Sequence, residues 1–174
     1  KLLQSLGSSN VGTALSFASV HPYDNKTKNK EAARRLHGAL NQSFLDPMLG
    51  KGYPTTLLPF YKKLDKHFRA TDNSLLRAKP DFWGLQVYTR ELVRHSPFVP
   101  YLKTRIVSAR KRNKPVTTLG QEIYYPALRE ILDWFIPYIR KDDIRGTEKP
   151  IYITECGISI YEETNKHPID DTYR

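Results

Sequence analysis

The 174-residue sequence is poor in sulfur, with one cysteine, Cys156, and one methionine. A single cysteine cannot form an internal disulfide, which favours a reducing compartment such as the cytoplasm. No apolar run approaches the ~18 residues that cross a membrane, and the first residues become polar too quickly for a secretory signal. The histidines show no zinc-ligand spacing and there is one cysteine, so we expect no metal site.

Acidic residues are also scarce: 18 Asp and Glu stand against 28 Lys and Arg, giving a net charge of +10. The densest basic cluster consists of Lys103, Arg105, Arg110, Lys111, Arg112 and Lys114. It has neither interleaved aromatic residues nor a recognisable RNA or DNA motif. We therefore interpret it as a solvated loop surface. A nucleic-acid-binding domain is the alternative, and it predicts an affinity that falls steeply with salt.

Apolar runs and amphipathic segments alternate along the chain. The runs predict buried strands at 11–18, 81–89 and 150–154. The amphipathic segments predict helices at 30–44, 57–68, 123–139 and from 169 onward. This alternation predicts an α/β fold whose parallel strands are joined by crossover helices.

The boundaries of these elements follow from breaking residues. His21 to Asn25 is expected to end the first strand, and Asp46-Pro47 to end the helix at 30–44. That helix should bury one face, formed by Ala33, Leu36, Leu40 and Phe44. Residues 90–120 predict a long irregular stretch of the kind that often binds ligands.

The last predicted helix contains two prolines. Pro126 suits a first helical turn, and Pro137 is expected to end or kink the helix. Trp134 and Tyr138 are therefore interpreted as packing residues rather than ligands.

Glu155 follows the third predicted strand, where active sites of parallel α/β proteins lie. A nucleophilic carboxylate needs hydrogen-bond donors that keep it ionised, and Tyr88, at the end of the preceding strand, is a candidate donor. A glutamate after a strand is more often a neighbour of a helix N-cap or a solvated loop residue, so its position alone does not indicate catalysis. His21, near the end of the first strand, is a candidate ligand contact or an ordinary loop histidine.

Five motifs along the chain resemble, in order and spacing, those of family 1 glycoside hydrolases. They are Phe44–Met48 with Gly52–Pro54, Asp81–Thr89, Gly120–Tyr124, Ile151–Gly157, and the pair Asp171 and Arg174. The corresponding family motifs are F-L-D-P-L with G-x-Y-P, D-F-x-G-x-N-Y-Y-T, G-W-E-I-Y, I-T-E-N-G, and D-x-x-R. The resemblance runs through nearly the whole chain.

The resemblance implies a partial (β/α)8 TIM barrel, roughly strands five to seven with their helices. Residues 1–174 would form a single partial domain, truncated at both ends. The family's acid/base glutamate would precede Lys1, and its last strand with a tryptophan-rich sugar-binding loop would follow Arg174. A full barrel needs ~250 residues. We therefore expect the isolated chain to leave open sheet edges and to fold poorly.

The resemblance also implies retaining hydrolysis of β-O-glycosidic bonds, as in β-glucosidases, with Glu155 as nucleophile. Tyr88 would position Glu155, and Gln86 would contact the β-linked glycoside. No cofactor is implied, and neither the sugar nor the oligomeric state is fixed.

The chain departs from the family motifs at several positions. Gln86 and Cys156 each replace an asparagine, Val87 replaces a tyrosine, and Gln121 replaces a tryptophan. These departures keep an alternative open: a catalytically inactive glycosidase-like protein that binds carbohydrate, or a degenerate fragment.

Overall fold

The computed structural model describes residues 2–7, 10–57, 62, 65–77, 80–140 and 149–160. Its sheet has three parallel strands, β1 (Thr13–Pro22), β2 (Trp83–His95) and β4 (Ile151–Cys156), with β2 between the other two. A short strand, β3 (Thr104–Ile106), pairs antiparallel with the far end of β2. The predicted parallel α/β arrangement is confirmed for β1, β2 and β4, whereas β3 was not predicted.

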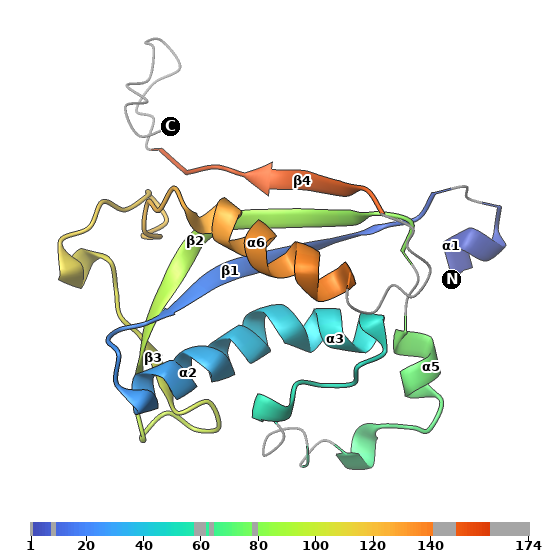
Figure 1. Ribbon diagram of the computed structural model, residues 1–174, viewed down its shortest axis with the longest axis horizontal. Helices are drawn as coiled ribbons and strands as arrows, with labels where there is room; N and C mark the ends of the chain where they lie inside the picture. Colours follow the sequence, from blue (N-terminus) through green and yellow to red (C-terminus); the bar gives the residue numbers. More distant parts are fainter. Residues whose placement is uncertain are drawn as a thin grey trace, which may run out of the picture.

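Helices pack beside the strands (Figure 1). The longer helical segments are α2 (Thr27–His37), a π-helical turn η1 (Gly38–Gln42), α3 (Ser43–Leu49) and α6 (Ala127–Arg140). The shorter ones are α1 (Leu2–Ser5), η2 (Thr55–Leu57), η3 (Asp65–His67), α5 (Asp72–Leu76) and η4 (Arg110–Arg112). Within the described parts of the chain, none of these helices has the length and hydropathy needed to cross a membrane.

The core lies between the strands and the helices α3 and α6. Its buried members are Phe17, Leu45, Trp83, Leu85, Val87, Ala127, Ile131 and Phe135. Burying a large apolar side chain stabilises a fold by about 1.5–3 kcal/mol, so this cluster anchors α6 firmly against β1 and β2. Trp134 and Tyr138 pack against the cluster, as predicted. Pro137 does not end the helix, which continues to Arg140.

The predicted helix at 30–44 has different boundaries in the structure. The helical run begins at Thr27 and passes through the π turn to Leu49, with Pro47 inside α3 rather than after it. A proline removes one backbone donor from a helix. The helix nevertheless continues past Pro47 to Leu49 and ends at Gly50, whose φ of +79° suits glycine and whose amide caps the carbonyls of Asp46 and Pro47.

The buried face of this helical run was also predicted incorrectly beyond its first half. Ala33 and Leu36 are buried, but Leu40 and Phe44 are 37% and 64% exposed. A π turn contains more residues than an α turn and therefore shifts the helical phase. Downstream of it, Leu45 faces the core instead.

Asn41, in the π turn, is fully buried and binds the backbone of β1. Its side chain accepts a hydrogen bond from the Ala18 amide at 3.0 Å and donates one to the Ala18 carbonyl at 2.9 Å. The register of the β1–β2 ladder shifts between Phe17 and Ser19, so Ala18 lies opposite two residues of β2. The amide of Asn41 thus satisfies both backbone polar groups of Ala18 at this irregularity.

The first two strands are longer than predicted. β1 continues through His21 to Pro22 and β2 continues to His95, because the two strands remain paired over residues that looked like loops. The expected irregular stretch therefore begins only after His95. For the expected helix at 57–68, residues 58–61 and 63–64 lie outside the described residues, and its described part contains only short 3-10 turns. The expected helix from 169 also lies outside the described residues.

The face of the sheet opposite the core is open. It carries Ala14, Ser16, Tyr152 and Glu155, all of them exposed. In a closed barrel such a face forms a packed interior.

We expect the isolated 174-residue chain to unfold without a cooperative transition, because this open face leaves its sheet half covered. Circular dichroism during a urea titration would measure this. A single sigmoidal transition with the slope expected for a fully folded chain of 174 residues would contradict the prediction.

Candidate active site

Glu155 reaches the open face of the sheet through an irregularity in β4. Leu85 pairs with Ile153, but the next pair joins Gln86 to Glu155, so Thr154 is an extra residue in β4. Side chains alternate between the two faces of a strand, and a shift of one residue reverses them. Without Thr154 as an extra residue, Glu155 would lie on the same face as Leu85. The bulge places it beside Gln86.

Gly84 allows the three parallel strands to approach one another just before this point. A Cβ at Gly84 would lie 3.0 Å from the Cβ of Ala14 on β1 and 3.0 Å from Cγ2 of Thr154 on β4. A larger residue would therefore require one of the strands to shift. The site residues follow directly after this close contact.

Both carboxylate oxygens of Glu155 accept hydrogen bonds from β2. Nε2 of Gln86 donates to Oε1 at 2.7 Å, and the hydroxyl of Tyr88 donates to Oε2. The bond to Glu155 raises the pKa of the Tyr88 phenol above its usual value, so Tyr88 is a protonated donor at neutral pH. Two donors from one strand fix the orientation of an ionised carboxylate.

An open pocket of about 600 Å³ lies against this carboxylate. Its walls are formed by Tyr88, Leu119, Gln121, Thr154, Glu155, Cys156, Gly157, Ile158 and Ser159. The volume lies within the range of pockets that bind small molecules. Of the three predicted residues that the structure brings together, Tyr88 and Glu155 line this pocket, and Gln86 holds Glu155 from β2.

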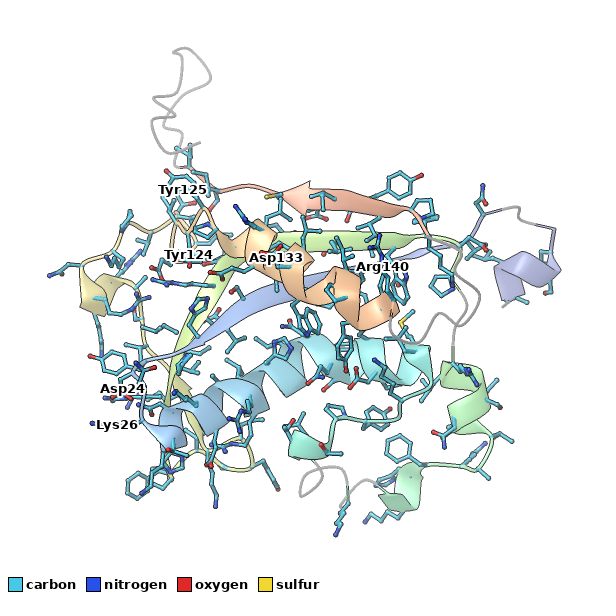
Figure 2. All side chains as sticks on the ribbon, viewed as in Figure 1. Asp24, Lys26, Tyr124, Tyr125, Asp133 and Arg140 are labelled. Atoms are coloured by element: carbon cyan, nitrogen blue, oxygen red, sulfur yellow. The ribbon has the colours of Figure 1, made fainter. Side chains whose placement is uncertain are left out.

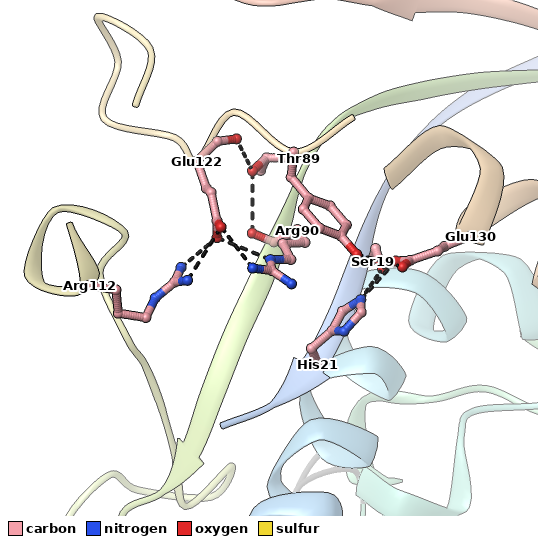
Figure 3. A network of polar contacts seen from close by, with 8 residues as sticks. Ser19, His21, Thr89, Arg90, Arg112, Glu122 and Glu130 are labelled. Atoms are coloured by element: carbon pink, nitrogen blue, oxygen red, sulfur yellow. Dashed lines mark hydrogen bonds and ion pairs between the residues drawn. The ribbon is translucent and has the colours of Figure 1, made fainter. Parts of the chain in front are cut away.

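His21 lies apart from these three residues. Its Nε2 lies 2.7 Å from Oε2 of Glu130 on α6 (Figure 3). In the β1–β2 register, His21 is five residues beyond Ser16, the partner of Gln86, or about 16 Å along the strand. The structure therefore does not bring His21 to the pocket beside Glu155.

Sequence reasoning missed a second polar cluster, which consists of Arg90, Glu122 and Arg112 and is called the Glu122 cluster below (Figure 3). Arg90 donates to Glu122 through Nε at 3.1 Å and Nη2 at 2.8 Å. Arg112 donates through Nη1 at 3.3 Å and Nη2 at 2.5 Å. The Glu122 side chain is 4% exposed. Burial alone would raise the pKa of Glu122, but the bonds from both arginines outweigh it and lower that pKa to about 2.

The two arginines of this cluster carry no sequence signal of their role. Arg112 was grouped with the basic surface of residues 103–114, whereas the structure pairs it internally and leaves its side chain 14% exposed. Its neighbours Lys103, Arg105, Arg110 and Lys114 are exposed, as the loop interpretation expects. Glu122 was noted only as part of the G-Q-E-I-Y motif.

Within the described residues, no group of three or more His, Cys, Asp or Glu side chains could hold a metal ion.

Comparison with known proteins gives a consistent family assignment. The family model described as Glycosyl hydrolase family 1 matches residues 3–174. Among characterised relatives, a furostanol glycoside 26-O-beta-glucosidase from Hellenia speciosa is 26% identical over 94% of this chain. A beta-glucosidase from an Agrobacterium species is 30% identical over 84% of this chain. The chain spans 30% of the length of each of these relatives.

Solved structures match the fold over nearly the whole chain. The virulence factor SghA from Agrobacterium tumefaciens is 26% identical, with a TM-score of 0.80, over 99% of this chain and 37% of its own. That protein has also been solved with its substrate analog salicin. The AHE enzyme from Alicyclobacillus herbarius matches with a TM-score of 0.80 at 25% identity, over 98% of this chain and 37% of its own.

Proposed function

Because the chain belongs to glycosyl hydrolase family 1, we propose that the full-length protein that contains it hydrolyses β-O-glycosidic bonds as a retaining, β-glucosidase-like enzyme. The observation that carries the proposal is the arrangement of Glu155, whose two carboxylate oxygens are held by Gln86 and Tyr88 at the edge of an open pocket. The characterised relatives that support it are named as β-glucosidases.

In the proposed reaction, ionised Glu155 attacks the anomeric carbon of the glycoside and the bond to the leaving oxygen breaks. A covalent glycosyl-enzyme forms, and water then releases the sugar with retained configuration. Tyr88 and Gln86 act as positioning residues for the attacking carboxylate. Because both donate from β2, they hold Glu155 in one orientation while one oxygen forms the new bond.

Retention requires a second carboxyl group about 5–5.5 Å from the nucleophile, to protonate the leaving oxygen. Glu155 is the only carboxylate among the described residues that line the pocket. We propose that residues outside this chain supply the acid/base group, that residues 1–174 form one partial domain, and that the chain corresponds to strands five to seven of a barrel. The 174 residues alone are therefore expected to be inactive.

The test is hydrolysis of 4-nitrophenyl β-glucoside by the full-length protein, with the first sugar anomer identified by NMR. Release of nitrophenolate with the β-anomer appearing first is expected. The α-anomer appearing first would exclude the retaining mechanism. Binding of the glycoside without release would favour the alternative, a catalytically inactive carbohydrate-binding protein, for which the replacement of the family asparagine by Cys156 is the motivating observation.

Replacing Tyr88 by phenylalanine is expected to lower kcat/KM for this glycoside by about 10- to 100-fold, because Glu155 loses the donor that orients Oε2. Steady-state kinetics of the full-length variant would measure the loss. The matched control is Tyr125→Phe, since Tyr125 is 68% exposed just before α6 and does not line the pocket (Figure 2). Equal rates for the parent and Tyr88→Phe would exclude a positioning role for this hydroxyl.

A further inference from the structure

Residues 116–122 form a small hairpin that lines the pocket. Val116 and Glu122 pair as an antiparallel bridge, and the Thr117 amide donates to the Gln121 carbonyl at 2.8 Å. Gly120 turns the chain with a φ of +80°, a backbone conformation that favours glycine. The hairpin therefore has a defined shape, and two of its residues, Leu119 and Gln121, form part of the pocket wall.

The tip of the hairpin touches the segment that follows β4. The Thr118 amide donates to the Ser159 carbonyl at 3.1 Å, and the two side-chain hydroxyls are 2.8 Å apart. Ser159 also lines the pocket. Leu119 remains 77% exposed at the tip, so it offers an apolar surface to whatever enters the pocket.

The base of the hairpin is held by two residues of β2 and one residue of η4. The Thr89 hydroxyl donates to the Glu122 carbonyl at 2.7 Å, while Arg90 and Arg112 bind the Glu122 carboxylate. The guanidinium of Arg90 also lies 4.0 Å over the ring of Tyr124. Consecutive residues of β2, directly after Tyr88, thus fix the base of the hairpin.

A buried ion pair costs desolvation and often adds little net stability compared with apolar residues. What such a pair does enforce is a single geometry, because each charge must stay with its partner. Arg90 comes from the sheet and Arg112 from the 3-10 turn η4, so the carboxylate joins three separate segments. The cluster therefore fixes where the hairpin starts relative to the strand that carries Tyr88.

We propose that the Glu122 cluster positions hairpin 116–122 as one wall of the substrate pocket, so that Glu122 is a positioning residue for substrate binding that does not itself touch the substrate. The identity of the pocket's ligand as a β-glycoside rests on the function proposed above. The role of the cluster in positioning the wall does not depend on that function. The hydrogen bonds from Gln86 and Tyr88 to Glu155 do not involve the Glu122 cluster. Loss of the cluster should therefore weaken substrate binding more than it slows the chemical step.

A displacement of the hairpin can be detected through the reactivity of Cys156, an exposed cysteine that lines the same pocket. The rate at which iodoacetamide alkylates Cys156 in the full-length protein is followed by mass spectrometry of the peptide that carries it. In Glu122→Gln, a displaced wall should raise this rate by about 3- to 10-fold. Arg112→Lys keeps the positive charge but loses the bidentate geometry, and should raise it by about 2- to 3-fold.

The matched control is Asp133→Asn on α6 (Figure 2). It makes the same carboxylate-to-amide change in an exposed ion pair. The side chain of Asp133 is 71% exposed and that of its partner Arg129 is 87% exposed. Its alkylation rate should equal that of the parent. Circular dichroism of each variant identifies any that fail to fold, and Arg112→Lys, the milder change, then decides the outcome.

Kinetics with the aryl β-glucoside give the second measurement. Glu122→Gln should raise KM by about 5- to 10-fold with kcat changed less than twofold, which is the signature of weakened ground-state and transition-state binding. Folded cluster variants whose Cys156 rate equals the parent's would overturn the proposal. So would a fall in kcat with KM unchanged. A parent that does not hydrolyse the glycoside would instead count against the proposed function, and the alkylation rates would still decide whether the cluster positions the wall.

Discussion

Glu155→Gln in the full-length protein is expected to lower kcat for aryl β-glucoside hydrolysis on the order of 10⁶-fold, the scale seen when a nucleophile is removed. Glutamine keeps the shape of the side chain and can still meet Gln86 and Tyr88, but its amide cannot form the covalent glycosyl-enzyme. The expected loss therefore falls on the chemical step. Single-turnover measurement of nitrophenolate release would detect it, with KM recorded in parallel.

The control for this change is again Asp133→Asn, an exposed carboxylate on the outer helix that should leave kcat unchanged. Turnover by Glu155→Gln within tenfold of the parent would mean that another group is the nucleophile. The bond network around Glu155 would then have a structural role only.

The second large effect is expected on stability. Glu122→Gln should lower the free energy of unfolding by about 3–5 kcal/mol, because it leaves the guanidinium groups of Arg90 and Arg112 buried without a compensating charge. These side chains are 18% and 14% exposed, which limits their hydration. The shift in the urea midpoint of the full-length protein measures this loss. A difference below about 1 kcal/mol, typical of exposed pairs, would contradict the prediction.

The same stability difference should depend on pH. The pKa of Glu122 is lowered from 4.5 to about 2 in the folded protein. A carboxyl group with a lowered pKa stabilises the fold above its unfolded pKa, and the contribution is lost as pH falls through the folded value. The gap between the parent and Glu122→Gln should therefore be constant above about pH 5 and shrink between pH 4.5 and 2. A gap that does not change over this range would exclude ionised Glu122 as its source.

The sequence was informative about the residues around Glu155. Apolar runs located all three parallel strands, and the ends of two of them predicted that Tyr88 would meet Glu155, as the hydrogen bond between them confirms. The prediction succeeded because carboxyl ends of adjacent parallel strands meet at one edge of a sheet. Gln86 was expected near the site on another ground, the resemblance of residues 81–89 to a motif of the family.

Features that depend on tertiary pairing were out of reach. His21 belongs to a continuing strand because β2 pairs with it, and no local signal distinguishes that from a loop. Arg90 and Arg112 are 22 positions apart and meet only through Glu122, so no spacing rule connects them. Leu40 and Phe44 fitted an ideal α-helical face, but the π turn, which contains Leu40 and precedes Phe44, changed the phase of the helix.

The π turn ties the length of a helix to the active site. The register shift that Asn41 stabilises at Ala18 lies opposite the residues of β2 that include Tyr88. Deleting one residue between positions 38 and 42 would restore a regular helix, withdraw Asn41 from Ala18 and leave two backbone groups of β1 without partners. The extra residue in the helix and the extra residue in β2 thus meet at one backbone position, Ala18. A deletion in the helix would therefore disturb the segment of the sheet that carries Tyr88 without removing any side chain that contacts Glu155.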